Sequence, residues 1–326
     1  MSTYTNQLQI PLALAVFLAT DDYDYEPGVI SATSLLKSTR QLVLSKRIAP
    51  GDVAIDISSL VSARMGSAIH AAIEKAWLNP EYALKALGYP KQVWGNVVIN
   101  PNPETLTESP QAIPVYMEQR AYKELLGFKV SGKYDFVAEG KVQDFKSTSV
   151  YNYINQSSIA KYVLQGSIYR WLNPNIITSD VMMIHYIFTD WSKASALQKD
   201  TYPQARVLTQ KLELLSLEST EAYVRNKLND VLKYKDTSET EIPFCSDEDL
   251  WRKPSVFKYY KNPEKTTRST ANFDNSVDAH TRLNEDGNVG IVKEVQGGVA
   301  ACNYCPAASI CTQKDIYIAS GELILN

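Results

Sequence analysis

The stretch SGKYDFVAEGKVQDFKST, residues 131–148, decides how the centre of the chain folds. Two short runs alternate apolar and polar residues on either side of a Glu-Gly pair, which predicts two antiparallel strands joined by a tight turn. If Ala138 pairs with Lys141, Asp135 lies directly opposite Asp144. At that position the Cβ atoms are about 5 Å apart, and like charges destabilise the sheet. Two carboxylates kept there indicate a cation between them.

Lys146 follows Asp144 by two residues, so the strand period places both side chains on one face. Carboxylates bind Mg²⁺ or Mn²⁺ because hard cations prefer oxygen ligands, and a nearby lysine can assist a metal-activated water. The alternative is a solvated hairpin face on which Lys133 and Lys146 balance the two acids. The same period in the first strand places side chains on two faces: Tyr134 and Phe136 on one, Asp135 and Val137 on the other.

The composition is that of an ordinary globular protein with a substantial core, since 44% of the 326 residues are apolar and 21% are charged. A formal net charge of -3 disfavours a surface coated in basic residues but is compatible with a local basic groove. The apolar run at 10–19 is too short to span a membrane and lacks the basic lead-in of a signal peptide. We therefore expect a cytoplasmic protein, in which four cysteines indicate metal or redox chemistry rather than disulfides.

The order of elements predicts an α/β fold, with a central mixed sheet flanked by helices on both faces. We expect strands at 112–122, 128–138, 141–147 and 181–188. We expect helices at 31–47, 56–77, 157–172 and over most of 203–234. A loop is expected around 100–110, and residues 235–300 are expected to be polar and irregular before a terminal helix.

Four polar residues outside the hairpin bear on its chemistry. Glu118 lies on the strand before the hairpin and could add a carboxylate, although a strand glutamate is more often simply exposed. His70 shares a helix stripe with Gly66 and points with the buried face, where a histidine is more often a hydrogen-bonded core residue than a ligand. Gln165 and Tyr169 are four residues apart and lie on one helix face.

Taken together and in this order, these residues resemble the PD-(D/E)XK nuclease superfamily, and within it the RecB-like exonucleases of bacteriophage type. The matching pieces are GSAIH (66–70), Glu118, GKYD (132–135), DFK (144–146) and QGSIY (165–169). The resemblance spans about residues 57–190 and rests on five spaced elements, which makes it more specific than any one of them.

The resemblance implies a restriction-endonuclease-like core and a role for each matching residue. Asp135 and Asp144 would be the central Mg²⁺ or Mn²⁺ ligands, with His70 as a further ligand. Lys146 would position or activate the attacking water, and Glu118 would support the metal site. Gln165 and Tyr169 would orient the lysine or the DNA backbone.

The cysteines form a second signal, Cys302-x₂-Cys305-x₅-Cys311, with Cys245 upstream. Four thiolates suit a tetrahedral zinc or an iron–sulfur cluster. Several RecB-like nucleases close their nuclease domain with a similar pattern and hold a 4Fe–4S centre, so the resemblance implies that cluster here, with zinc as the alternative. In those proteins the remaining cysteine precedes the nuclease motifs, whereas Cys245 follows them. The cluster type and Cys245 as a ligand therefore stay open, with His280 as a substitute zinc ligand or unliganded thiols as further alternatives.

The segment 251–270 carries six basic residues and one acidic residue, with aromatic residues between them. That combination suits phosphate contact and base stacking. The expected DNA-binding residues are Lys253, Lys258, Tyr259, Tyr260 and Lys261. The alternative is an exposed loop without a partner.

The expected function is a metal-dependent DNA exonuclease, acting on single- or double-stranded ends in phage or bacterial recombination, repair or degradation. Alternatives are a catalytically silent DNA-end-binding or assembly module and a structure-specific endonuclease. The intact set of Asp135, Asp144 and Lys146 argues against the silent module. Besides DNA, a second copy of the chain or a recombination or replication protein is a candidate partner, and no membrane is expected. The expected domains are an N-terminal helical segment (1–56), the nuclease core (57–234) and a basic loop with the C-terminal cysteine-cluster segment (235–326).

Overall fold

The computed structural model describes residues 3–20, 26–48 and 54–325. The chain divides into two compact units: unit one comprises residues 1–36 and 54–229, and unit two comprises residues 37–53 and 230–326. The domain boundaries expected from the sequence lie after residues 56 and 234. They divide the chain by expected function, and they stay a prediction.

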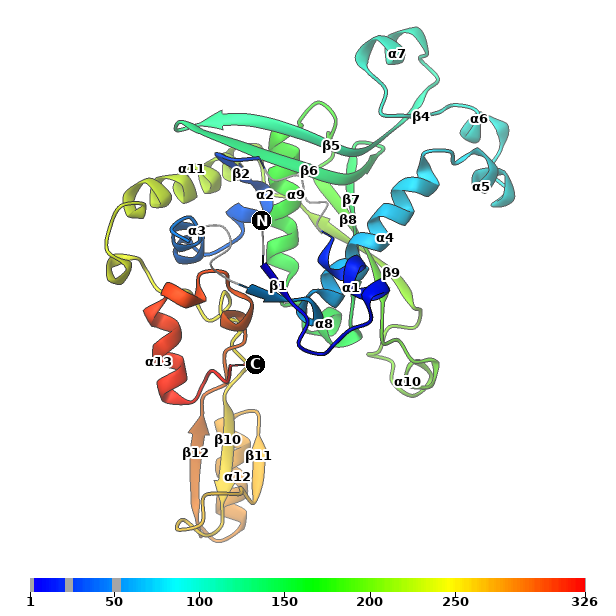
Figure 1. Ribbon diagram of the computed structural model, residues 1–326. Coiled ribbons are helices and arrows are strands. Elements are labelled where there is room, and N and C mark those ends of the chain that lie inside the picture. Colours follow the sequence, from blue (N-terminus) through cyan, green and yellow to red (C-terminus); the bar gives the residue numbers. More distant parts are fainter. Residues whose placement is uncertain (1–2, 21–25, 49–53, 326) are drawn as a thin grey trace. The chain divides into compact units, whose positions relative to one another are not determined.

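Unit one contains, within its described residues, a mixed seven-stranded sheet (Figure 1). The strands lie in the order β4-β5-β6-β7-β8-β9, and the short β2 pairs with β6. The pairs β5/β6, β6/β7 and β8/β9 are antiparallel, whereas β2/β6, β4/β5 and β7/β8 are parallel. Their bounds are β2 Val29–Ser31, β4 Val97–Ile99, β5 Ile113–Leu125, β6 Phe128–Ala138, β7 Lys141–Thr148, β8 Val181–Phe188 and β9 Val207–Glu213. The four predicted strands and the mixed sheet are confirmed.

Two helices, α4 (Val61–Trp77) and α9 (Ile159–Leu172), cover the sheet on opposite faces. Ile168 of α9 belongs to the main apolar cluster together with Val142 of β7. Trp77 of α4 packs in a second cluster with Phe145 of the same strand. Because Val142 and Phe145 are an odd number of residues apart on β7, their side chains point to opposite faces. The α/β fold with helices on both faces of the sheet therefore follows from the alternation within β7.

Helix α9 approaches β6 closely at Gly132. A Cβ atom there would lie 2.7 Å from Leu172 Cδ1 and 3.0 Å from Tyr169 Cδ1. Either contact is below normal van der Waals separation, so a side chain at this position would push the helix away from the strand. The absence of a side chain fixes α9 against the strand that carries Asp135.

The remaining helices and short strands of unit one show where the sequence prediction was right and where it was wrong. The helix predicted at 56–77 is confirmed as a 3₁₀ turn, η1, followed by α4, and the side chain of Asp56 accepts a hydrogen bond from Ser58 N at its start. The expected loop at 100–110 contains a helix capped by Asn102. The mostly helical segment expected at 203–234 begins with strand β9 before α11. The bounds are β1 Thr3–Thr5, α1 Leu12–Ala19, α2 Ala32–Leu35, β3 Ala54–Asp56, η1 Ile57–Leu60, α5 Glu81–Ala86, α6 Lys91–Trp94, α7 Pro103–Glu108, α8 Val150–Asn155, α10 Lys193–Gln198 and α11 Leu217–Tyr234.

Unit two contains a three-stranded antiparallel sheet in the order β11-β10-β12, with helix α12 packed on it. The expectation that residues 235–300 are irregular was wrong, because Tyr259 and Ala279 are fully buried between this sheet and α12 and supply a small core. The predicted helix after the last cysteine is confirmed as α13. The bounds are α3 Thr39–Ser45, η2 Glu239–Glu241, β10 Val256–Tyr260, β11 Ala271–Phe273, α12 Ser276–Glu285, β12 Ile291–Val295, η3 Ala301–Tyr304, η4 Ala308–Ile310 and α13 Thr312–Ser320.

The apolar run near the N-terminus forms α1, which is eight residues long. Among the described residues, no helix combines the length and apolar character that crossing a membrane requires.

Candidate functional site

The predicted hairpin turn is present. Ala138 pairs with Lys141, and the two residues between them, Glu139 and Gly140, both have positive φ values of 52° and 68°. Two consecutive positive φ values match the right-handed twist of the flanking strands in a two-residue hairpin loop. The turn therefore sets the register that the sequence predicted.

The paired part of this hairpin ends one residue before the two aspartates. The last pair is Phe136 with Gln143, so Asp135 and Asp144 lie where the strands separate rather than in a regular ladder. A gap of this kind lets two acidic side chains and a third group meet without the constraints of a hydrogen-bonded pair. Both acids lie directly beyond the Phe136–Gln143 pair on adjoining strands, and each affects the pKa of the other.

The alternation predicted for β6 is not followed. Tyr134 and Val137 both belong to the main cluster on the α9 side, whereas Phe136 belongs to the cluster on the α4 side. The break falls at Asp135, whose would-be partner on β5 is Glu118. The β5/β6 pairing skips both residues, and Glu118 has a φ of 52°, which is uncommon for a side chain of this kind. Both carboxylates thus occupy a local irregularity in the sheet.

His70 of α4 reaches Asp135 and the backbone of β7. Its Nε2 lies 2.7 Å from the carbonyl oxygen of Phe145, and its Nδ1 lies 3.2 Å from Asp135 Oδ2. A carbonyl oxygen accepts only, so Nε2 donates to it and Nδ1 is the nitrogen that faces the carboxylate. The close carboxylate of Asp135 raises the pKa of His70 against the opposing effect of burial.

Asp144 and Lys146 form the second part of the site. Lys146 Nζ lies 2.7 Å from Asp144 Oδ2, and only 3% of Asp144 is exposed. The ammonium also lies 5.2 Å from the ring centre of Tyr162 on α9. Lys146 is therefore held between a buried carboxylate and an aromatic ring.

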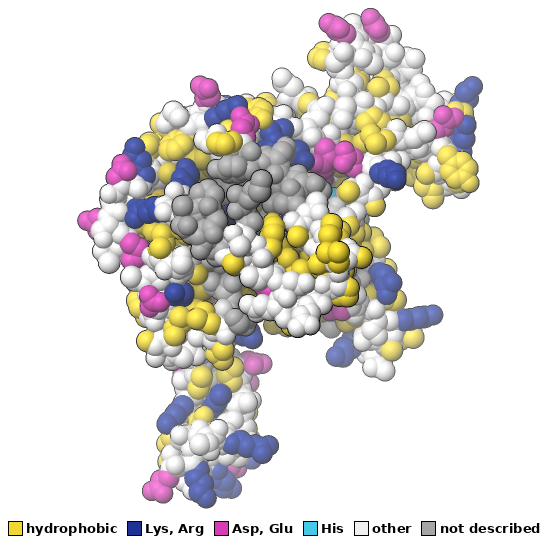
Figure 2. Space-filling view, viewed as in Figure 1, with side chains coloured by type: hydrophobic (Ala, Val, Ile, Leu, Met, Phe, Trp, Pro, Cys, Tyr) yellow, Lys and Arg dark blue, Asp and Glu magenta, His cyan; other side chains and the backbone are white. Residues whose placement is uncertain are grey.

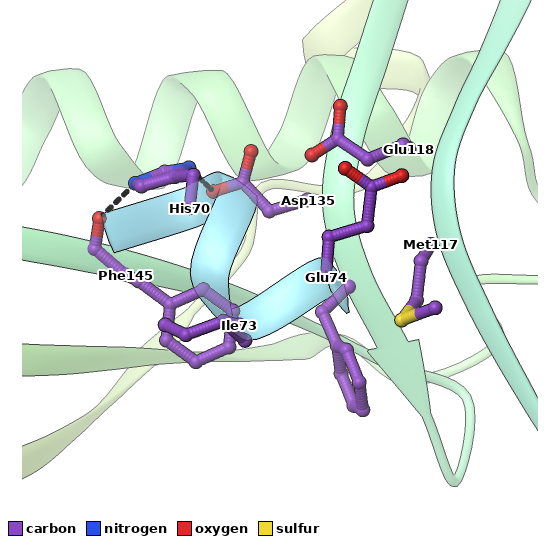
Figure 3. A pocket seen from close by; sticks show the side chains of 8 residues that line it. His70, Ile73, Glu74, Met117, Glu118, Asp135 and Phe145 are labelled. Carbon is purple, nitrogen blue, oxygen red and sulfur yellow. Dashed lines mark hydrogen bonds and ion pairs between the residues drawn. The ribbon is translucent and has the colours of Figure 1, made fainter. Parts of the chain in front are cut away.

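A pocket on the α4 side joins His70 and Asp135 to two further carboxylates, Glu118 and Glu74 (Figure 3). Glu74 follows His70 by four residues on α4, so both lie on one face of the helix. Glu118 also forms an ion pair with Lys133 at 2.8 Å. Sequence reasoning missed Glu74, although the His-x₃-Glu spacing was visible.

The ionisation of this group follows from burial and close charges. Burial raises the pKa of Asp144 to about 6, and the charge of Asp135 adds to that effect while Lys146 opposes it. Burial also acts to raise the pKa of Asp135, but the close contact with His70 and the charge of Lys146 outweigh it and lower the value. Burial acts to lower the pKa of Lys146, and Asp144 with Asp135 more than reverses this, so the net shift is upward.

The side chains of this site are of the type that binds a divalent cation, but they do not form a complete set of ligands around one point. Asp135 Oδ2 and Asp144 Oδ2 are buried, and neither takes part in a hydrogen bond, since their contacts with His70 and Lys146 are ion pairs without hydrogen-bond geometry. Buried oxygens normally have a hydrogen-bond partner, and hard cations favour such oxygens. Among residues 3–20, 26–48 and 54–325, however, no group of three or more His, Cys, Asp or Glu side chains is arranged to hold a metal ion. His70 and Lys146 balance the two acids instead.

Gln165 and Tyr169 bond to each other rather than to the lysine. Gln165 Nε2 donates to the Tyr169 hydroxyl at 2.8 Å, and Tyr169 is buried against Gly132. The residue of α9 that contacts Lys146 is Tyr162, three residues before Gln165 and so on a neighbouring part of the same face. Sequence reasoning missed Tyr162 because nothing in its spacing distinguishes it from other core tyrosines.

The four cysteines form no disulfide and are half-buried in unit two, where the charges of the other three contribute to the pKa of Cys302. Across residues 3–20, 26–48 and 54–325 they are not arranged as a metal-holding group. Cys245 Sγ lies 3.1 Å from Ser38 Oγ, and Cys245 N donates to Gln313 Oε1 of α13 at 2.8 Å. Burial raises the pKa of Cys302 to about 11, with repulsion from the other three cysteines adding to the shift. Burial likewise raises the pKa of Cys245 and Cys305.

A buried arginine from the N-terminal part of the chain lies against this group. Arg40 is 1% exposed; its Nε donates to Cys311 Sγ at 3.2 Å, and its NH1 donates to the carbonyl oxygen of Ile242 at 2.8 Å. It also forms an ion pair with Glu239. Arg40 thus fastens residues 239–242 to the last cysteine. His280 lies on α12 and hydrogen-bonds the carbonyl oxygen of Ser276 at 2.8 Å.

The basic segment 251–270 is only partly the loop that its composition suggested. Tyr259 is fully buried, with its hydroxyl donating to the carbonyl oxygen of Val289 at 2.7 Å, and Tyr260 is 6% exposed. Neither ring presents a free face for a base, so the expected stacking role of both tyrosines was wrong. Lys253 and Lys261 are exposed and Lys258 is half-buried, so these lysines stay candidates for phosphate contact.

Comparison with known proteins gives little beyond this geometry. No family model matches the chain, and no curated protein matches it. A solved structure described as SSO0001 is 16% identical with a TM-score of 0.37, covering 66% of this chain and 80% of that one. A solved phage related exonuclease from Haemophilus somnus 129PT is 14% identical with a TM-score of 0.28, covering 64% of this chain and 93% of that one. Both scores are below 0.5, so neither likeness determines the fold or the activity.

Proposed function

We propose that the protein is a metal-dependent deoxyribonuclease with a PD-(D/E)XK core of the RecB-like type, acting as an exonuclease on DNA ends. One observation carries the proposal: Asp135 and Asp144 meet beside Lys146 in a gap between two strands, and each has a buried oxygen without a hydrogen bond. Burying two carboxylates side by side costs stability, and a cation bound to both would offset that cost.

Asp135, Asp144 and His70 are the residues that would hold Mg²⁺ or Mn²⁺. When bound, the cation would act as a Lewis acid on a phosphoryl oxygen and lower the pKa of a water molecule. The contacts of His70 suit this role, since Nε2 is engaged with the Phe145 carbonyl oxygen and only Nδ1 faces the acids. Holding the other ring nitrogen by a backbone carbonyl is the usual way a metal-binding histidine is oriented.

Lys146 would act through its charge. Asp144 and Asp135 raise the pKa of Lys146, so the amine stays protonated near neutral pH. A protonated amine cannot accept a proton from water, but it can stabilise negative charge on a phosphate and orient the attacking water. We therefore assign Lys146 to electrostatic stabilisation rather than to general base catalysis.

The other residues of the resemblance take supporting roles in this proposal. Glu118 lines the same pocket as His70 and Asp135 and would support the metal site through the charge it adds. Gln165 and Tyr169 form a hydrogen-bonded pair on α9, which would keep that helix face rigid beneath the DNA backbone.

The DNA contact in unit two is proposed for one face of the β11-β10-β12 sheet, over which Lys and Arg side chains gather (Figure 2). Lys258 of β10 pairs directly with Lys293 of β12, and among the described residues neither forms an ion pair. Like charges directly opposite one another destabilise a sheet, and a phosphate between them would relieve the repulsion. Their neighbours Phe257 and Glu294 face the side of Tyr259, on which α12 packs, so the lysines point away from the helix.

The cysteines would hold a structural 4Fe–4S cluster, or a zinc ion as the alternative, with Cys245, Cys302, Cys305 and Cys311 as ligands. Support comes from the chemistry of the set, since four free thiols in unit two match the ligand count of either group. The raised thiol pKa values mean that binding must displace protons, so affinity should increase with pH.

The test is cleavage of end-labelled linear DNA and closed circular DNA by the purified protein with Mn²⁺. Degradation of linear DNA alone, abolished by EDTA and by Lys146→Ala, is the expected result. Cleavage of the circle would favour an endonuclease instead. Binding of DNA ends without any turnover would replace the proposal with the silent end-binding module.

A further inference from the structure

A second pocket lies on the α9 side of the sheet, beyond the groups assigned to chemistry. It is formed by the end of β7, by α8, by the first turn of α9 and by one residue of β8. The lining residues are Thr148, Asn152, Tyr153, Gln156, Ser158, Ile159, Tyr162 and Tyr186. None of these side chains is acidic or basic, and three of them are tyrosines.

This pocket adjoins the proposed active site through two side chains. Tyr162, which lines it, is the ring that lies 5.2 Å from Lys146 Nζ. Tyr186, which also lines it, pairs with Lys146 across β7 and β8 and is close enough to Asp144 for the carboxylate to affect its pKa. Thr148 follows Lys146 by two residues, so it lies on the same face of β7, about 7 Å along the strand.

The lining has the groups that recognise a nucleoside. Tyr153 and Tyr162 are half-buried, and within the described part of the chain neither hydroxyl makes a hydrogen bond. Asn152 is exposed, and its side-chain amide makes one long contact, Nδ2 to Thr148 Oγ1 at 3.4 Å. Its Oδ1 has no hydrogen-bond donor among the residues that the structure describes. Aromatic faces stack on bases, and amide groups hydrogen-bond base edges.

The charge distribution indicates where the base and the phosphate of such a ligand would lie. The pocket itself is neutral, while the positive charge stands at its edge on Lys146. A base with its sugar would therefore occupy the pocket, and its phosphate would lie towards the lysine. A free anion or a peptide carboxylate would find no charged partner inside.

We propose that this pocket binds the base and sugar of the DNA nucleotide next to the cleaved phosphate. The inference rests on the nuclease function proposed above. In this arrangement Tyr162 contacts both the Lys146 ammonium and the nucleotide. The side chains of Tyr153, Tyr162 and Asn152 then determine the position of the DNA strand end.

The experiment measures binding of fluorescent single-stranded oligonucleotides by anisotropy, with Ca²⁺ in place of Mn²⁺. In a series of oligonucleotides, one abasic nucleotide is moved along the strand. A base that stacks on an aromatic side chain contributes enough that its removal should weaken binding about 5-fold to 100-fold. We expect this loss at one position near the end, with little change elsewhere.

A protein variant tests whether that position corresponds to this pocket. Asn152→Trp places a large ring at the mouth of the pocket from an exposed helix position, so it should weaken binding of the intact oligonucleotide about 10-fold and remove the abasic effect. The control is Tyr151→Trp on the same helix, at a residue that is 72% exposed and does not line the pocket; it should bind like the wild type.

The outcomes separate this inference from the nuclease proposal, because cleavage by the wild type in Mn²⁺ is measured alongside. Cleavage with equal binding of every abasic oligonucleotide, or wild-type binding by Asn152→Trp, overturns the pocket assignment and leaves the nuclease intact. An abasic effect that Asn152→Trp removes, without cleavage, supports the pocket and rejects the nuclease. A wild-type protein that fails to bind any oligonucleotide overturns the assignment as well.

Discussion

Two groups of ionisable side chains in this chain differ in how their charge is handled. In unit one, the acids Asp135 and Asp144 are held against His70 and the Lys146 ammonium. In unit two, burial raises the pKa of Cys245, Cys302 and Cys305, so these thiols are neutral near pH 7. The first group holds separated charges at short range, whereas the second holds neutral donors beside an apolar cluster.

The difference indicates two separate uses. Charges held in place before a reaction stabilise charge that develops during it, which is what a catalytic site requires. Neutral thiols become strong ligands only when a metal displaces their protons, and the binding energy then adds to folding. We therefore expect changes in the first group to affect rate and changes in the second to affect stability.

The largest effect is expected on cleavage. Asp144→Asn and Lys146→Ala should each lower the rate at saturating DNA by about 10³-fold, since each removes several kcal/mol of transition-state stabilisation. Lys141→Ala, at the half-buried start of the same strand, is the control and should keep full activity. Single-turnover cleavage measures the rate, and thermal unfolding confirms the fold. Normal turnover in Asp144→Asn would remove the distinction between the two groups.

Cys305→Ser should act in the opposite way. Losing one ligand of a structural metal site should destabilise unit two by several kcal/mol, while correctly folded molecules keep their cleavage rate. Ser309→Ala, an exposed position between two cysteines, serves as the control. Iron and zinc analysis with thermal unfolding of anaerobically purified protein measures the effect. A variant as stable as the wild type, in protein containing neither metal, would reduce the cysteine group to ordinary packing.

Arg40→Met asks whether the cysteine group depends on its buried arginine. Removing one member of a buried ion pair leaves Glu239 uncompensated, and such losses cost about 3–5 kcal/mol. The matched control is Arg47→Met, because Arg47 also donates to backbone carbonyl oxygens but is exposed. It should change the free energy of unfolding by less than about 1 kcal/mol. Urea unfolding of both variants measures the difference, and equal values would show that burial of Arg40 does not matter.

The sequence predicted the hairpin well because its determinants are local. Alternation and a Glu-Gly turn fix the Ala138–Lys141 pair, and that pair sets the approach of Asp135 to Asp144. The break in alternation at Asp135 could not be predicted, since it depends on pairing with Glu118 on another strand and on two apolar clusters. A period-two pattern assumes a regular ladder, and here the ladder is interrupted.

Contacts between distant segments were the other part that the sequence did not reveal. Arg40 reaches Cys311 across 271 positions of chain, and no local spacing indicates such a contact. The basic residues around Tyr259 predict a DNA contact, yet the ring is buried and packs under α12. A small sheet with a basic surface and a disordered basic loop can have the same amino-acid composition. Only the packing of the side chains distinguishes the two.

The smallest expected effect is on the free energy of unfolding, through the buried carboxyl group of Asp144, and its size depends on pH. The pKa of Asp144 is about 6 in the folded protein and 3.8 in its ordinary state, so folding favours the protonated acid. Stability from this residue is therefore full below pH 4 and is lost as pH rises through 6. Asp144→Asn, which resembles the protonated acid, should be more stable than the wild type at pH 7.5 in EDTA by about 1–3 kcal/mol.

That advantage should disappear at pH 4, and Mn²⁺ should reverse it, because the cation binds and stabilises only the protein that keeps both carboxylates. Glu139→Gln, an exposed acid in the same hairpin, is the control and should show neither trend. Unfolding curves at the two pH values, with and without Mn²⁺, measure all four differences. A less stable Asp144→Asn in EDTA at pH 7.5 would mean that the Lys146 ion pair stabilises the fold, and the hairpin would then resemble the cysteine group in being structural.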